Sequence, residues 1–329
     1  MGRLAVLRKF RHTFFRLGLP VGGTVGLLTW LFYHVPVPEV IAAAGQIDWP
    51  AVVLFTLILV VSLFLWDGVC LSWLFTDPGK RFSYRHALWV RGQAYLLTVV
   101  HLGMGQGLLA YLVSRVRQIP FLTAVGRCLI MLYVDVGLLF LMGMLAAIIS
   151  HDPRTEGIAR FCALGLLGLA LVTLLAFWIP QFLSLGGPTK WGTAVAAAGI
   201  PWIRVICLYP LRFIYFLFGL VHAGVILALC DVWLDASTIV SVMPLTSLAD
   251  GLPISVAGLG TRETLFLTLL EPPQPAAVLA GSLIWWVTML VGRAGIGLIL
   301  LWLSVLGLAY YGPAIHRLNE QSEGGNGQD

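Results

Sequence analysis

The chain has 329 residues, of which 59% are hydrophobic and 11% are charged, and its formal net charge is +5. This composition excludes the ordinary soluble classes, because apolar runs of about 20 residues recur along the whole length, as in polytopic helical membrane proteins. The basic residues cluster beside these runs and form no stripe interleaved with aromatics, so nucleic acid is not expected as a partner. The five cysteines lie singly without metal-binding spacing, and no metal or cofactor is predicted.

Six apolar segments are long enough to cross a bilayer as single helices. They lie near residues 17–35, 51–75, 121–149, 158–184, 203–230 and 277–310. Two further apolar stretches, about 86–114 and 237–270, are broken by glycines at their middle. Each half has about 12 residues, which at about 1.5 Å per residue is too short for a hydrocarbon core of roughly 30 Å. We therefore predict an all-α polytopic membrane protein with about six full spans and two re-entrant helical hairpins.

The predicted spans form one transmembrane domain over residues 17–312. A basic arm over residues 1–16 precedes it, and a polar, glycine-rich tail over residues 313–329 follows it. The tail has the composition of a disordered segment. We expect no separate soluble domain, because no hydrophilic segment approaches the roughly 50 residues that a domain needs.

Basic and acidic residues fall on opposite sides of the predicted spans. One side holds the N-terminal arm, Lys80, Arg81, Arg85, Arg91, Arg115, Arg117, Lys190 and Arg317. The other side holds Glu39, Asp48, Asp152, Glu156, Asp231, Asp235 and Glu271, with Arg154 and Arg160 as its basic residues. The positive-inside rule then predicts that both termini are cytoplasmic.

The two glycine breaks are related by an offset of 155 residues. Four pairs share this offset: Gly103 with Gly258, Gly105 with Gly260, Pro120 with Pro275 and Gly126 with Gly281. Either the matches are coincidental or residues 51–149 and 203–310 form an internal repeat. An odd number of crossings separates the two units, so a repeat would be inverted, as in many secondary transporters.

The most informative motif is Pro253-Ile-Ser-Val-Ala-Gly-Leu-Gly-Thr-Arg-Glu263, which sets an arginine and a glutamate beside a break in the helix. Ionisable residues at membrane depth cost several kcal/mol and indicate a functional site. The second helix of each hairpin is predicted to begin near Gly105 and near Gly260, with an N-terminus that favours an anion. The segment therefore predicts a site for a phosphate or carboxylate group.

Several side chains have two interpretations at this point. Arg262 would bind phosphate oxygens through its planar fork. Glu263 either holds Arg262 in place or caps the helix, and Ser255 either donates to a headgroup oxygen or satisfies the loop backbone. The candidate substrate-binding residues are Arg262, Glu263, Ser255, Gly258, Gly260, Gly103, Gly105, Gln106, Arg127, Asp135 and Arg293. No catalytic residue is predicted.

Other charged residues interrupt the spans. Asp135 lies close to the middle of a span, and its candidate partners are Arg127 and Arg293, in a substrate site or in a structural salt bridge. A second set lies nearer the ends of the apolar segments, where long side chains reach the interface and snorkelling is expected. That set is Asp67, Arg91 and Arg212.

The 253–263 motif resembles the signature of the lysylphosphatidylglycerol synthase transmembrane-domain family, which are flippase-like integral membrane proteins. The signature positions are Pro253, Ser255, Gly258, Gly260, Arg262 and Glu263. The order of spans over residues 15–312 also fits, as does the early glycine break followed by a span bearing Asp135. The chain is similar to a stand-alone member, because it lacks the C-terminal synthase domain. It departs from the family at Gln106 and Gly107, where relatives often have charged residues, which bears on the headgroup preference.

The resemblance implies translocation of a lipid or lipid-linked intermediate with an anionic headgroup between the leaflets of a bacterial inner membrane. Two other functions stay open: a membrane-embedded enzyme acting on a lipid headgroup, and a non-catalytic partner of a lipid synthase or glycosyltransferase. An enzyme would use Glu263 or Asp135 as acid or base, but the sequence has no metal cluster or nucleophile–base pair to support it. A transporter function is therefore the first expectation, and a lipid-modifying enzyme is a possible partner.

Overall fold

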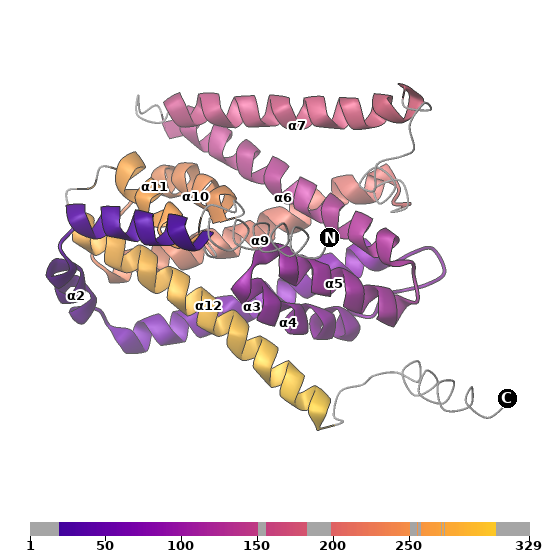
Figure 1. The fold of residues 1–329 in the computed structure, drawn as a ribbon, viewed down its shortest axis with the longest axis horizontal. Helices are drawn as coiled ribbons and strands as arrows, with labels where there is room; N and C mark the ends of the chain where they lie inside the picture. The colour runs from indigo at the N-terminus through magenta and orange to yellow at the C-terminus, as the bar shows by residue number, and fades with distance from the viewer. Residues whose placement is uncertain are drawn as a thin grey trace, which may run out of the picture.

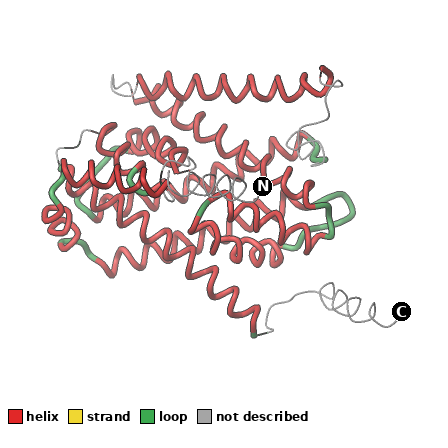
Figure 2. Tube along the Cα trace, in the orientation of Figure 1, coloured by secondary structure: helices red, strands yellow, loops and turns green. Residues whose placement is uncertain are grey.

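The computed structural model describes residues 20–150, 156–182, 199–250, 255, 258–270, 272 and 274–306. Within these ranges the chain is built of helices and contains no strand (Figures 1 and 2). Five helices are long and apolar enough to cross a membrane, and a bent pair of helices is a sixth candidate. The prediction of an all-α polytopic membrane protein is confirmed. The predicted basic arm and polar tail lie outside the described residues.

The five long helices coincide with five of the predicted spans. They are α3 (Trp49–Phe75), α6 (Phe121–Ser150), α7 (Glu156–Phe182), α9 (Trp202–Leu229) and α12 (Pro275–Val305). Asp48 caps α3 by accepting a hydrogen bond from the backbone N–H of Ala51 at 3.2 Å. Prolines occupy the first turns of α3 and α12, where the backbone N–H groups have no intrahelical partner. The starts of these helices are therefore encoded locally.

The first predicted span is described as a helix over Pro20–His34, and it continues into a helix that the sequence analysis did not predict. This second helix is α2 (Val37–Gly45), and the pair is bent by 83°. The bend lies at Pro36, immediately before α2. Proline lacks a backbone N–H and disfavours helical geometry in the residue before it, so it ends the first helix.

The two broken stretches each form a pair of short helices. They are α4 (Tyr84–Val100) with α5 (Leu102–Arg117), and α10 (Ala236–Asp250) with α11 (Thr261–Leu270). Their lengths are 17, 16, 15 and 10 residues, so three exceed the predicted half-length. At about 1.5 Å per residue even the longest is shorter than a core of about 30 Å. The members of each pair pack on each other, and their entry into a membrane from one side stays a prediction.

The first break lies before the position that the glycines suggested. His101 separates the two helices, and α5 begins at Leu102, three residues before Gly105. A Cβ on Gly105 would lie 2.7 Å from the Cα of Thr98, so this glycine lets α5 approach the backbone of α4. The second break is placed as predicted, because α11 begins directly after Gly260.

The helices form two units with the same order of lengths: long, short, short, long. The first unit is α3 to α6, and the second is α9 to α12. Between the units α3 packs on α9, α4 packs on α12 and α10 packs on α6, so each contact has its counterpart. An inverted repeat requires such reciprocal contacts, and the repeat itself stays a prediction.

Helices α3 and α9 run antiparallel. The indole Nε1 of Trp66, in the second half of α3, donates to the backbone carbonyl of Leu211 at 2.7 Å. Thr56, near the start of α3, contacts His222, near the end of α9, with 3.2 Å between Oγ1 and Nε2. The beginning of α3 and the end of α9 therefore lie at the same end of the bundle.

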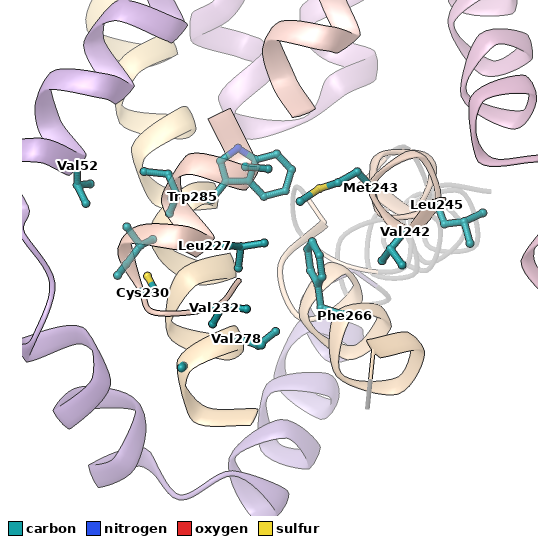
Figure 3. Packing of buried hydrophobic residues seen from close by; sticks show 14 of the residues in the cluster. Val52, Leu227, Cys230, Val232, Val242, Met243, Leu245, Phe266, Val278 and Trp285 are labelled. Atoms are coloured by element: carbon teal, nitrogen blue, oxygen red, sulfur yellow. The ribbon is translucent and has the colours of Figure 1, made fainter. Parts of the chain in front are cut away.

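Each unit has its own apolar core. The larger cluster lies mainly in the second unit and includes Leu227, Val242, Met243, Phe266, Val278 and Trp285 (Figure 3). The other lies in the first unit and includes Leu71, Phe75, Ala87, Leu109 and Met131. Helix α7 packs on α6 at the edge of the bundle (Figure 1) and exposes large apolar side chains, as a lipid-facing helix would. Polar residues buried between the two units are therefore the candidates for function.

Candidate functional site

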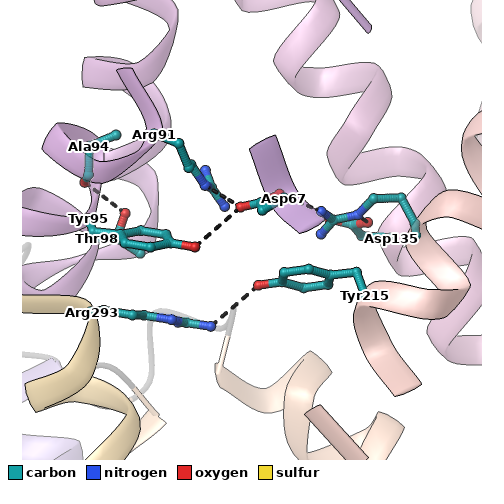
Figure 4. A network of polar contacts seen from close by, with 9 residues as sticks. Asp67, Arg91, Ala94, Tyr95, Thr98, Asp135, Tyr215 and Arg293 are labelled. Atoms are coloured by element: carbon teal, nitrogen blue, oxygen red, sulfur yellow. Dashed lines mark hydrogen bonds and ion pairs between the residues drawn. The ribbon is translucent and has the colours of Figure 1, made fainter. Parts of the chain in front are cut away.

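Four ionisable side chains from four helices meet where the two units pack together (Figure 4). Arg91 of α4 donates from Nε to Oδ2 of Asp67 in α3. Arg212 of α9 donates from Nη1 to Oδ1 of Asp67 at 2.8 Å. It also donates from Nη2 to Oδ2 of Asp135 in α6 at 2.8 Å. Arg212 thus bridges the two carboxylates, and we call these four residues the ionic network.

Three of the four residues of the ionic network are buried, and the Asp135 side chain is 16% exposed. Asp67 is 0% exposed, Arg212 is 3% exposed and Arg91 is 5% exposed. The expectation that these three side chains snorkel to an interface is therefore wrong. Each isolated ion would cost several kcal/mol to bury, and the structure avoids this cost by bringing opposite charges together from different helices. These partners lie on other helices, so they could not be predicted from the sequence of each span taken separately.

Asp135 does not pair with either of the arginines that the sequence suggested. Arg127 instead binds Asp77, in the loop after α3, with 2.6 Å between Nη2 and Oδ1. Arg117 at the end of α5 binds the other oxygen of Asp77 at 2.8 Å. Arg127 precedes Asp135 by eight residues, or about 12 Å of helix, which places the two at different depths.

The Asp77 cluster joins the loop after α3 to the ends of α5 and α6. Partial burial raises the pKa of the Asp77 carboxyl, but the hydrogen bonds and positive charges of Arg127 and Arg117 outweigh this effect and lower the pKa overall. Asp77 is therefore held in its ionised form, and it fixes the base of the first pair of short helices.

A third arginine, Arg293 of α12, lies beside the ionic network. Its Nη2 donates to the hydroxyl of Tyr215 at 3.4 Å, and its guanidinium carbon lies 5.8 Å from the centre of the Tyr95 ring. The Tyr95 hydroxyl in turn donates to Asp67 at 3.5 Å (Figure 4). Among the described residues no carboxylate pairs with Arg293. Three arginines and two aspartates therefore leave one positive charge in excess.

The described part of the 253–263 motif forms the start of α11. Arg262 is 6% exposed, and its guanidinium carbon lies 4.2 Å from the centre of the Trp285 ring, a cation–π contact. Glu263 is 0% exposed, and its Oε2 accepts a hydrogen bond from the Gly260 N–H at 2.7 Å. The Glu263 carboxylate therefore contributes to capping the start of α11. Ser255 contacts the Thr261 hydroxyl at 2.7 Å, so it supports the turn.

The glycines of the two turns have different roles. Gly258 and Gly260 have φ angles of 81° and 88°, which side-chain-bearing residues rarely adopt. Gly103 has its N–H bound to Nδ1 of His101 at 3.0 Å and forms the first turn of α5. Gln106 follows in the next turn and is partly buried. The second turn therefore needs glycine for its backbone angles, whereas the first is capped by a histidine.

The candidate residues fall into two groups along α12. One group surrounds Arg293, and the other surrounds Trp285, eight residues earlier and about 12 Å away along the helix. Arg127 belongs to neither group. The residues that sequence reasoning missed are Asp67, Arg91, Arg212, Tyr95 and Tyr215. One signal was available, since Asp67 is the single charged residue in the 27 residues of α3.

No group of His, Cys, Asp or Glu in the described part of the chain has the geometry of a metal site. Comparisons with known protein families, characterised proteins and solved structures find no match to this chain. The residues and their contacts are therefore the basis for a functional proposal.

Proposed function

We propose that the protein translocates a lipid or lipid-linked intermediate with an anionic headgroup between the two leaflets of a membrane. The observation that carries the proposal is the ionic network where the two units meet, together with the partly buried Arg293 beside it. Ionisable residues inside membrane-spanning segments mark pathways for polar groups. In secondary transporters the substrate site lies at the interface between two repeats, and these residues lie where the two units of this chain pack together.

The charges favour an anionic cargo. A buried ion pair contributes little net stability compared with apolar residues of similar size, so stability alone is a weak reason for five charges in this position. Three of the five are arginines, which remain protonated in proteins and bind phosphate through two parallel hydrogen bonds. The resemblance of residues 253–263 to the flippase-like family supports a lipid as the carrier of the anion.

We also propose the bacterial inner membrane as the location, with both termini cytoplasmic. Asp48 before α3 and Asp231 after α9 lie at one end of the bundle, while the loop that contains Lys80 and Arg81 lies at the other. The positive-inside rule assigns the basic end to the cytoplasm. A cysteine introduced at Lys80 should react with a membrane-impermeant reagent only after the cells are opened. Labelling from outside would reverse the orientation, and the parent chain with its five native cysteines is the control.

The translocation test uses the purified protein in liposomes with a fluorescent phosphatidylglycerol in the inner leaflet. We expect transfer to the outer leaflet faster than in protein-free liposomes, and slower transfer of the matching phosphatidylcholine. Arg262→Lys keeps the charge but loses the planar fork, so it should slow transfer if Arg262 contacts the headgroup. Transfer no faster than in protein-free liposomes would refute the proposed function. Unchanged transfer by Arg262→Ala would refute only the role of Arg262.

The same liposomes distinguish the other functions. Mass spectrometry of the recovered lipid should find an unchanged headgroup, because translocation breaks no bond. A chemically altered headgroup would identify an enzyme in place of a translocase. Transfer that occurs only when a lipid synthase is reconstituted with the protein would identify a partner function.

A further inference from the structure

We propose that Arg293 binds a single phosphate group of charge −1, and that this group belongs to a lipid lying against the exposed tip of the α4–α5 pair. The lipid part of this inference rests on the proposed function. The anion site itself rests on charge and hydrogen bonding alone.

The carboxylates of the ionic network bind other arginines and make no contact with Arg293 in the described part of the chain. Arg91 and Arg212 each take one oxygen of Asp67, and Arg212 contacts both oxygens of Asp135. Arg293 receives only the Tyr215 hydroxyl and the face of the Tyr95 ring. The excess charge of the site is therefore located on Arg293.

Arginine cannot lose this charge as a buried lysine or histidine would. Its guanidinium stays protonated at any physiological pH, so a counter-charge must come from elsewhere. A phosphodiester carries one negative charge, which balances the excess of one, and its two free oxygens match the guanidinium fork. A group with two negative charges would overcompensate the site. The charge balance thus favours a singly charged anion, and we assign it to the phosphodiester of a lipid.

A second cationic donor lies near the same tyrosine ring. Nη1 of Arg91 is buried and has no hydrogen-bond acceptor in the described part of the chain. The guanidinium carbons of Arg91 and Arg293 lie 5.1 Å and 5.8 Å from the centre of the same Tyr95 ring (Figure 4). A buried donor without an acceptor is unfavourable, and a phosphate oxygen is a strong acceptor. The unsatisfied donor of Arg91 and the guanidinium of Arg293 therefore both lie near one tyrosine.

The surroundings of Arg293 favour a lipid phosphate over a free one. Helix α4 runs antiparallel to α12, since Gly92 lies against Leu300 and Leu96 lies against Gly297. One further turn along each helix brings Val100, the last residue of α4, level with Arg293. Val100 is 57% exposed and Met104, in the first turn of α5, is 51% exposed. An open apolar surface at the depth of a charged group suits an acyl chain beside a phosphate.

Binding to the purified full-length protein in detergent tests this inference without transport. The probes are short-chain phosphatidylglycerol and inorganic phosphate, measured by titration calorimetry. We expect the parent to bind phosphatidylglycerol, Arg293→Gln to weaken binding by roughly tenfold or more, and Arg293→Lys to weaken it less. The matched control is Arg160→Gln, which removes an exposed arginine paired with Glu156 and should bind as the parent does.

Several results would overturn the inference. Equal binding of phosphatidylglycerol by the parent and by Arg293→Gln would show that Arg293 does not bind the lipid. Water would then solvate the Arg293 guanidinium. Inorganic phosphate that binds as tightly as the lipid and competes with it would refute the lipid assignment. Thermal melting of Arg293→Gln checks its fold, and Arg293→Lys gives a second reading if that variant is unstable.

The two proposals fail separately. A protein that binds phosphatidylglycerol through Arg293 but moves no lipid in liposomes would refute the proposed function and leave this site in place. A protein that moves lipid while Arg293→Gln binds it unchanged would refute the site and leave the function in place.

Discussion

Helix α3 of the first unit carries Asp67 between two arginines, whereas the position 155 residues later, in α9 of the second unit, is occupied by His222. Both side chains are 0% exposed. His222 makes one hydrogen bond, to Thr56, and lies among the apolar residues of the larger core. Positions related by the 155-residue offset therefore hold a carboxylate paired with two arginines in one unit and an imidazole with one hydrogen bond in the other. A site built between such units is asymmetric, because the first unit supplies both aspartates and Arg91, whereas the second supplies Arg212 and Arg293.

The two pairs of short helices also differ in the contacts that hold them. The α4–α5 pair is held at its base by Asp77 and its two arginines. The α10–α11 pair is held at its turn, where Glu263 caps α11 and Gly260 packs against Leu27 of the N-terminal helix. Ion pairs fix one pair of helices, and backbone geometry fixes the other. Substitutions that remove these contacts test whether the two units also differ in how much each contact contributes to the free energy of unfolding.

The largest expected effect is at the ionic network. Asp67→Asn leaves two buried arginines without their shared carboxylate and should destabilise the protein by about 3–5 kcal/mol. The equivalent change in the second unit, His222→Gln, removes at most one neutral hydrogen bond, worth about 1 kcal/mol. Unfolding in detergent, followed by circular dichroism, measures both. Equal losses would show that the two positions are energetically alike.

The Asp77 cluster should give the next largest effect and a dependence on pH. Asp77→Asn weakens two charge-assisted contacts and should cost about 1.5–3 kcal/mol. Because the pKa of Asp77 is lowered in the folded state, its contribution is complete above the unfolded value of about 3.9 and is lost as pH falls through the folded value. The melting temperature of the parent should fall more steeply below pH 4 than that of Asp77→Asn. Identical pH profiles would contradict this assignment.

Glycines in the two pairs should respond in opposite directions. Gly260→Ala forces a φ of +88° on a residue with a side chain and brings its Cβ within 2.9 Å of Leu27, so a loss of about 1–2 kcal/mol is expected. Gly107→Ala, inside α5, meets nothing within 4 Å and should stabilise the helix by about 0.5–1 kcal/mol. Melting temperatures of the two variants would decide the matter, and a loss in both would count against the geometry of α5.

The smallest expected effect concerns the starts of α10 and α4. Asp235 accepts a hydrogen bond from the Thr238 N–H at 3.0 Å, whereas Ser83 at the start of α4 makes no capping hydrogen bond. Asp235→Ala should therefore cost about 1 kcal/mol, and Ser83→Ala much less. Hydrogen bonds from Ser237 and Thr238 lower the pKa of Asp235 to about 2, so the cap should survive to pH 3. Hydrogen exchange in the first turns of the two helices would show the difference.

Much of the fold follows from local properties of the sequence. The long apolar runs became α3, α6, α9 and α12 because a chain in hydrocarbon must satisfy its own backbone hydrogen bonds, and a helix does so within one segment. The turn before α11 was predictable for a similar reason, since only glycine adopts the angles of Gly258 and Gly260 without strain. The bend at Pro36 has a local cause as well, although the helix beyond it lacked a pattern strong enough to predict.

The partners of the charged residues were decided by tertiary structure alone. Asp67 pairs with Arg91, 24 residues away in sequence, and with Arg212, 145 residues away. Asp135 pairs with Arg212 and not with Arg127, which lies on the same helix as Asp135. Such pairs depend on how far each helix is shifted and rotated against its neighbours. The apolar sequence of a span predicts neither the shift nor the rotation. The sequence by itself therefore determined where the long apolar helices lie and where the second pair of short helices is broken. The packing of helices determined which charges share a site, because a buried ion is stable only beside the opposite charge that packing brings to it.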